Sequence, residues 1–301
     1  MKKALCILGF CLLLCILCGC QKKDQISLLV PIGSTQLAQL YLQNNPDYSV
    51  DTVVGSDPLV AGFSARDYDV IVAPVNLGAK LYQSNQAYRL GAVIVWGNYY
   101  LAARDATLSS WDDLAGQTVV VFGQGQIPDI VFSYLLSELD ITIQPIYVDS
   151  SATAASMLAV DADKIVMVAE PSVSSLRQQF PNCQLLDIQE KFGEITDREA
   201  FPQAGVFLRS DLDLDQATQC LSDLEQSILQ VNSDPEAAAI LAVELGMPFP
   251  GDVVTQAIPR SHLQYVSAGD AKSAIEAFLS IVLDFSPGLI GGELPDDEFY
   301  Q

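Results

Sequence analysis

The chain alternates short apolar runs, rich in β-branched residues, with stretches that have helical periodicity, and turns rich in glycine, proline or serine join them. This alternation is typical of α/β folds with largely parallel sheets. The first region contains three such units, with strands predicted over 26–31, 50–54 and 69–73. A second region repeats the unit, with strands predicted over 118–122, 143–148 and 164–168.

Two strand-like runs, 90–96 and 99–103, separate these regions, and a strand over 204–209 precedes a mainly helical remainder. The remainder lacks the strands for a lobe of its own, so its helices are expected to pack back on the first region. A chain of this length also exceeds the size at which single cores usually stop growing. We therefore predict an α/β fold of two Rossmann-like lobes joined by a hinge of two chain crossings, with a ligand cleft between the lobes. Its predicted parts are a signal peptide over 1–20, a first lobe over 21–99 and 206–301, and a second lobe over 100–205.

Residues 1–20 predict export from the cytoplasm. Lys2 and Lys3 precede an uncharged, mostly apolar run over 4–19, which is short for a membrane span of roughly 20 apolar residues. The run closes on Gly19-Cys20 and resembles a bacterial lipoprotein signal with its lipobox. The resemblance implies cleavage before Cys20, lipid attachment to the Cys20 thiol, and a domain held at the outer face of the cell membrane. A plain signal peptide and an uncleaved anchor are the alternatives.

Charge and cysteine content narrow the class of partner. The formal net charge of −22 repels phosphate backbones, which argues against nucleic-acid binding. Outside residues 1–20 only Cys183 and Cys220 are present, and neither has CxxC or metal-ligand spacing. Two buried free thiols are favoured over a disulfide between them.

Four loops that lead into predicted helices are candidate ligand-binding segments. A helix N-terminus presents unpaired N–H groups, and in open α/β sheets such loops line a crevice at the carboxyl ends of the strands. The alternative for each hydroxyl is that it only caps its own helix. The candidate residues in these loops are Ser34, Thr35, Ser56, Asn76, Gln124 and Gln126.

Three further candidates depend on where the predicted strands end. Trp96 and Asn98 lie at the first crossing, where a side chain can contact both lobes, and the indole can either stack on a flat ligand or pack the hinge. Glu170 follows an apolar strand and precedes a helix. Its carboxylate either accepts hydrogen bonds from a ligand or is stabilised by the helix N-terminus.

Several motifs together resemble a known family. They are residues 111–119 (WDDLAGQTV), the glycine-containing turn 123–129, Ala169-Glu170-Pro171 and the closing segment 291–300. With the order of strands and helices, they look like the type 2 periplasmic-binding-protein fold. The chain is most similar to the nitrate/sulfonate/taurine and thiamine-precursor branch of ABC-transporter substrate-binding lipoproteins. This resemblance implies a small-molecule ligand, an ABC permease and ATPase as partners, and a monomer.

Signs of enzymatic chemistry are scarce. His262 is the single histidine, and outside the predicted signal segment over 1–20 the sequence has no GxSxG, HExxH, P-loop or CxxC motif. Gly123-x-Gly125 begins a dinucleotide-like pattern, but Pro128 stands where the third glycine belongs. The pyrimidine synthase that shares this fold carries a His and Cys motif that this chain lacks. We therefore expect no catalytic activity and no cofactor, and assign no metal ligands.

The sequence thus predicts a lipid-anchored solute receptor of an ABC importer that closes on its ligand by hinge motion. Basic residues are few near the candidate loops, with Lys80, Arg104 and Arg260 the nearest in sequence. A neutral or weakly cationic aminopyrimidine-like heterocycle is therefore favoured slightly over a sulfonate or nitrate. A ligand-sensing lipoprotein that acts on a membrane receptor is the alternative, and an enzyme on the same fold is less favoured.

Overall fold

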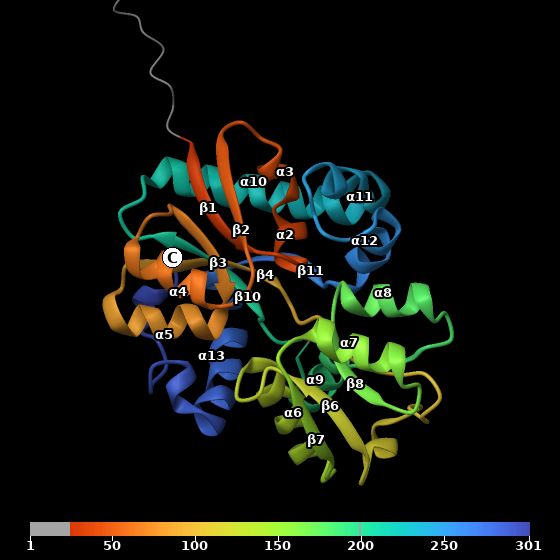
Figure 1. The fold of residues 1–301 in the computed structure, drawn as a ribbon. Helices are drawn as coiled ribbons and strands as arrows, with labels where there is room; N and C mark the ends of the chain where they lie inside the picture. Colours follow the sequence, from red (N-terminus) through yellow and green to blue (C-terminus); the bar gives the residue numbers. More distant parts are fainter. Residues whose placement is uncertain (1–24, 199) are drawn as a thin grey trace, which may run out of the picture.

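The computed structural model describes residues 25–198 and 200–301, which form two β-sheets covered by helices (Figure 1). The strand order is β11-β4-β10-β3-β1-β2 in the first sheet and β7-β6-β8-β5-β9 in the second. The predicted α/β fold with two lobes is confirmed, but the described sheets are mixed rather than largely parallel. Four pairs of strands are parallel and five are antiparallel, because each strand next to a crossing, β4, β5, β9 and β10, pairs antiparallel with its neighbours. The predicted signal segment and Cys20 lie outside the described residues.

The first sheet carries apolar side chains on both faces because helices cover both of them. β2 and β3 run parallel to β1, and β10 pairs antiparallel with β3 and β4. Side chains alternate along β3, so that Ile71 and Ala73 join one apolar cluster while Val70 and Val72 join another. The strands are β1 (Ile26–Pro31), β2 (Tyr48–Val53), β3 (Val70–Pro74), β4 (Tyr88–Val95), β10 (Ala204–Arg209) and β11 (Leu263–Ser267).

Two groups of helices provide these clusters. The Ile71 face packs against α4 (Asp57–Ala65), α5 (Val75–Asn85) and α13 (Ala268–Phe285). The Val72 face packs against α2 (Ser34–Ala38), α3 (Leu40–Gln43), α10 (Leu214–Ser233), α11 (Pro235–Glu244) and α12 (Gly251–Ala257). The sequence predicts one helix up to Leu42, but the buried Gln39 leaves helical geometry (φ −109°, ψ 20°) and separates α2 from α3. The side-chain amide of Gln39 donates to the carbonyl of Gln36 at this break.

The second sheet is smaller, and helices also cover both of its faces. Its strands are β5 (Tyr99–Ala103), β6 (Thr118–Phe122), β7 (Gln144–Val148), β8 (Ile165–Ala169) and β9 (Gln184–Asp187). Its faces are covered by α6 (Ile127–Glu138) and α9 (Ile188–Thr196) on one side and by α7 (Ser151–Val160) and α8 (Ser172–Gln179) on the other. The sequence does not predict β9 or β11, because the side chains of these short strands are mostly half-buried and show no alternation of buried and exposed positions. It also does not predict α9 or α12.

The chain crosses between the sheets over residues 96–98 and again between α9 and β10. The second crossing carries Phe201 into the interior, where its ring centroid lies 5.6 Å from that of Phe278 of α13 and 5.3 Å from that of Phe192 of α9. One apolar cluster therefore continues from the first sheet through the hinge into the second. Figure 1 shows α13 at this junction, between α5 of the first lobe and α6 of the second.

Both cysteines of the described chain are buried free thiols, as the sequence favours. Cys183 packs in the α7–α8 cluster of the second lobe, and Cys220 packs on α10 in the first. Burial raises the pKa of both thiols, that of Cys220 to about 12. The prediction of two buried free thiols is confirmed, and the thiols lie in different apolar clusters.

The close approach of α5 to the first sheet depends on Gly78. A Cβ at this position would overlap the ring of Phe207, which is fully buried between Phe63 and Phe299 and has no room to move. Alanine is favoured over glycine in a helix by up to about 1 kcal/mol, whereas overpacking a core costs about 1–3 kcal/mol. We therefore expect Gly78→Ala to lower the free energy of unfolding, measured by urea denaturation.

The matched control is Gly269→Ala in the first turn of α13, where a Cβ would meet no atom within 4 Å. This variant is expected to be as stable as the wild type or slightly more stable. Equal stability of Gly78→Ala and Gly269→Ala would contradict the packing of α5 on Phe207.

Candidate functional site

A cavity of about 450 Å³ lies between the two lobes. The loop after β1 and the starts of α4 and α5 line it from the first lobe, and the starts of α6 and α8 line it from the second. These loops meet because the parallel strands β1, β3, β6 and β8 all end there. The position is the one at which open α/β sheets bind ligands.

Most of the predicted ligand-binding residues come together in this cavity, although they are far apart in the sequence. Those from the first lobe and the first crossing are Ser34, Thr35, Ser56, Asn76 and Asn98. Those from the second lobe are Gln126 and Glu170.

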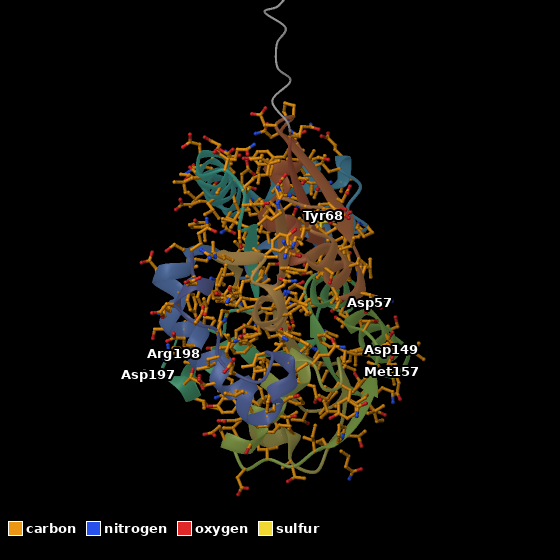
Figure 2. All side chains as sticks on the ribbon, turned by 90° about the vertical axis from the view of Figure 1, so that its left-hand side faces the viewer. Asp57, Tyr68, Asp149, Met157, Asp197 and Arg198 are labelled. Atoms are coloured by element: carbon orange, nitrogen blue, oxygen red, sulfur yellow. The ribbon has the colours of Figure 1, made fainter. Side chains whose placement is uncertain are left out.

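The structure places Trp96 and Gln124 outside the cavity. The indole Nε1 of Trp96 donates to the carbonyl of Gln264 at 3.1 Å, and the ring lines a separate cavity with His262 and Arg198. Figure 2 shows Arg198 beside α13, on the opposite side of the molecule from Asp57 at the start of α4. Gln124 is exposed and lies between two glycines that adopt left-handed conformations.

Gln203, Phe122 and Leu289 are among the lining residues that were not predicted. Gln203 lies at the second crossing, where a side chain can contact both lobes, as Asn98 does at the first crossing. Phe122 ends β6 immediately before the candidate turn. Leu289 belongs to the C-terminal segment that packs back on α5, and no sequence signal places it at the cavity.

A buried chain of hydrogen bonds holds Asn98. Its Nδ2 donates to Ser34 Oγ at 2.9 Å, and Ser34 Oγ donates to Ser261 Oγ at 3.0 Å. Ser261 Oγ in turn donates to the carbonyl of Ala257 at 2.9 Å. The hydroxyl of Ser34 is thus part of a tertiary network rather than a cap of its own helix, whose N-cap is Gly33.

The remaining hydroxyls of the site differ from Ser34. Thr35 Oγ1 donates to the carbonyl of Pro31 at 2.6 Å, a local bond within the loop after β1. Ser56 is exposed and its side chain makes no capping hydrogen bond to α4. Neither the Ser34 nor the Ser56 hydroxyl therefore caps its own helix, which was the alternative to a ligand-binding role.

Amide oxygens in the cavity wall have no hydrogen-bond partner within residues 25–198 and 200–301. They are Oδ1 of Asn76, Oδ1 of Asn98 and Oε1 of Gln203. Asn76 and Asn98 are only 8% and 5% exposed, and Asn76 uses its Nδ2 to donate to the carbonyl of Leu289 at 3.2 Å. Since buried polar atoms are normally paired, these oxygens are candidate acceptors for a ligand.

Glu170 contacts the start of α8 and also lines the cavity. It accepts hydrogen bonds from the backbone N–H of Ser174 at 3.1 Å and from Ser174 Oγ at 3.0 Å, so it stabilises the first turn of α8. It is also 5% exposed and lines the cavity. Burial raises its pKa to about 7, against the opposing effects of the Ser174 bonds and of Arg260 and Arg177. Its role toward a ligand stays a prediction.

Positive charge is scarce at the cavity. Lys80 is the single cationic side chain among the described lining residues, and it is exposed. In Figure 2 the exposed carboxylates Asp57 and Asp149 lie on the same side of the molecule, one in each lobe. The electrostatics of this region therefore suit a neutral or cationic ligand better than an anion.

A second group of contacts joins the lobes next to the cavity. The hydroxyl of Tyr100 in β5 donates to the carbonyl of Arg260 at 2.9 Å and lies 3.1 Å from Nε2 of His262. Nε2 of His262 is also 3.6 Å from the carboxylate of Asp187 at the end of β9. These contacts place the single histidine at the interface of the lobes and outside the lining of the interlobe cavity.

Neither a membrane span nor a metal cluster is found in the part of the chain that the structure describes. None of its helices is both long and apolar enough to cross a bilayer. Its His, Cys, Asp and Glu side chains form no group of three or more that could hold a metal ion.

Solved structures share this architecture, whereas no protein-family model and no curated protein sequence matches the chain. A crystal structure of an ABC transporter from Parabacteroides distasonis has a TM-score of 0.83 at 21% identity, over 92% of this chain and 99% of that one. The periplasmic aliphatic sulphonate-binding protein of Escherichia coli has a TM-score of 0.69 at 13% identity, over 92% and 91%. A zinc-bound ligand-binding component of an ABC-type import system from Staphylococcus aureus has a TM-score of 0.65 at 16% identity, over 92% and 96%. The chain therefore has the fold of periplasmic binding proteins, as its resemblance to that group implies.

The raised pKa of Glu170 predicts a pH dependence of stability. The unfolded carboxyl ionises near pH 4.5 while the folded one stays protonated up to about pH 7, so the folded state binds more protons between these values. The free energy of unfolding contributed by this group falls as pH rises through that window and is constant above it. At 1.36 kcal/mol per pKa unit, the loss is about 3 kcal/mol.

We expect Glu170→Gln to remove this decline, so that its stability relative to the wild type is greater at pH 8 than at pH 4 in urea denaturation. Glu138→Gln, at an exposed carboxylate near the end of α6, controls for the loss of one negative charge. Parallel stability profiles for the wild type and Glu170→Gln would show that Glu170 is not desolvated.

Proposed function

We propose that this protein is the extracytoplasmic solute-binding component of an ABC importer, anchored to the membrane through lipid on Cys20. We further propose that its ligand is a small N–H-rich molecule, an aminopyrimidine-like heterocycle rather than a sulfonate or nitrate. The observation that carries the proposal is the interlobe cavity with buried, unpartnered amide oxygens on Asn76 and Asn98.

The fold supports the transport role. Structures with this architecture include proteins described as the ligand-binding component of an ABC-type import system and as a periplasmic sulphonate-binding protein. In this chain, Asn76 lines the cavity from the first lobe and Glu170 from the second. A ligand that contacts both lobes stabilises the closed arrangement by its differential affinity for it, and a permease with its ATPase would recognise that arrangement.

The polar groups support the ligand class. A sulfonate or nitrate presents only acceptor oxygens, and these would meet the unpartnered oxygens of Asn76, Asn98 and Gln203. An amino-substituted heterocycle instead supplies N–H donors to these oxygens and to the Glu170 carboxylate. Tyr99 and Phe122 both line the cavity, with their ring centroids 5.7 Å apart, and they offer apolar surface to the flat ring of such a ligand.

The site also supports a role in binding rather than catalysis. His262 is held by Tyr100 outside the interlobe cavity. Both described cysteines are buried in apolar clusters away from it. The described cavity wall therefore offers no histidine base or thiol nucleophile next to a bound ligand.

A thermal-shift screen of residues 21–301 tests the proposal. The probes are 4-aminopyrimidine, 2-aminopyrimidine, methanesulfonate and nitrate. At 1,000 times the dissociation constant, a ligand adds about 4 kcal/mol, or roughly 10 °C for a protein of this size. We expect such a shift with an aminopyrimidine and none with the anions. A shift with methanesulfonate alone would replace the proposed ligand class while leaving the solute-binding role in place.

Glu170 is expected to contribute directly to affinity. Glu170→Gln keeps an oxygen for the Ser174 N–H but removes one carboxylate acceptor, and we expect about tenfold weaker aminopyrimidine binding by calorimetry. Glu138→Gln is the matched control and should bind as the wild type does. Equal affinities for the wild type and Glu170→Gln would restrict Glu170 to its contact with α8.

A further inference from the structure

We propose that Ser261, which does not line the cavity, fixes the orientation of the side-chain amide of Asn98 so that its Oδ1 accepts a hydrogen bond from the ligand. The site then selects ligands with N–H donors. Ser261 would thus be a positioning residue that acts through Ser34. The inference concerns the ligand class of the site proposed above and rests on that function.

The direction of the hydrogen-bond chain follows from its far end. The carbonyl of Ala257 can only accept, so the single hydroxyl proton of Ser261 is committed to it at 2.9 Å. The oxygen of Ser261 then accepts the proton of Ser34 at 3.0 Å, which leaves the oxygen of Ser34 as an acceptor. Asn98 must therefore present its NH₂ group to Ser34, at 2.9 Å, and keep its Oδ1 free.

The reversed orientation of the amide is disfavoured by a count of the same bonds. If Asn98 turned its oxygen to Ser34, Ser34 would donate to Asn98, and Ser261 would have to donate to Ser34 to keep their contact. The bond from Ser261 to the Ala257 carbonyl would then be lost, and the chain would contain two hydrogen bonds in place of the three observed. All four residues are buried, so water does not compensate for the loss.

Asn76 shows the same arrangement by independent means. Its Nδ2 donates to the carbonyl of Leu289, which also can only accept, and its Oδ1 has no partner in the described chain. Two amides from different elements are thus both fixed with their oxygens unpaired at one cavity. A ligand with N–H donors satisfies both oxygens, whereas an isostere with acceptors leaves them unpaired.

Ser261→Ala removes the acceptor for the Ser34 proton. Ser34 can then donate to Asn98 Oδ1, the amide can turn its NH₂ group toward the cavity, and the preference for donors is relaxed. Ser280→Ala is the matched control, because Ser280 makes the same hydroxyl bond to a carbonyl four residues earlier, on α13 and away from the cavity.

The first arm of the test measures selectivity by calorimetry, with 4-aminopyrimidine as the donor probe and 4-methoxypyrimidine as the acceptor isostere. We expect the wild type and Ser280→Ala to prefer the amino compound by about tenfold or more, as a single unsatisfied buried group implies. Ser261→Ala is expected to lose most of that preference. An unchanged preference in Ser261→Ala, or a wild type that prefers the methoxy compound, would overturn the inference.

The second arm needs no ligand. The side-chain NH₂ signals of Asn98, identified by their loss in Asn98→Asp, should exchange slowly with solvent in the wild type and in Ser280→Ala, and faster in Ser261→Ala. Equal exchange in all three proteins would overturn the inference. If the wild type binds neither pyrimidine, the proposed ligand class fails, and the exchange measurement still decides the orientation of Asn98.

Discussion

Apolar packing across the hinge is the constraint on which the rest of the structure depends. One cluster extends from Ile71 of β3 through Phe201 of the second crossing to Phe192 of α9, and α13 contributes Phe278 to it. Because this contact holds the lobes together on the hinge side, the carboxyl ends of their parallel strands meet around a cavity. Loops from distant parts of the sequence are thereby brought to one site.

The cavity combines apolar walls with a small number of polar groups whose orientations are fixed by hydrogen bonds to other residues of the protein. Asn98 is held through Ser34 and Ser261, and Asn76 is held by the carbonyl of Leu289. Glu170 is held by Ser174 and is desolvated enough for its pKa to rise. Such sites discriminate by hydrogen bonds, because a mismatched ligand leaves buried groups unpaired. This preorganisation connects the packing of the lobes with the chemistry of the proposed ligand.

The site could be predicted from sequence where local rules decide it. Ser34 and Asn76 lie in the first turn of a helix that follows a strand, and Gln126 lies just before such a helix, so the alternating pattern alone places them at the carboxyl edge of a sheet. The same pattern failed for Trp96, since its position at the crossing is correct but its indole turns to Gln264 on the other side. A side-chain direction at a crossing depends on the strand it packs against, and β11 was not recognisable from its sequence.

The sequence by itself determined the α/β alternation and the class of fold, because period and turn residues are local properties of the chain. It did not determine that five of the nine described strand pairs are antiparallel. Tertiary structure alone decided that Ser261 is linked to Asn98 through Ser34 and that Leu289 lies at the cavity beside Asn76. It also decided that burial raises the pKa of Glu170. These features join residues separated by up to 227 positions in the chain. Hydrogen-bond partners and desolvation depend on which atoms meet after folding, and no local pattern carries that information.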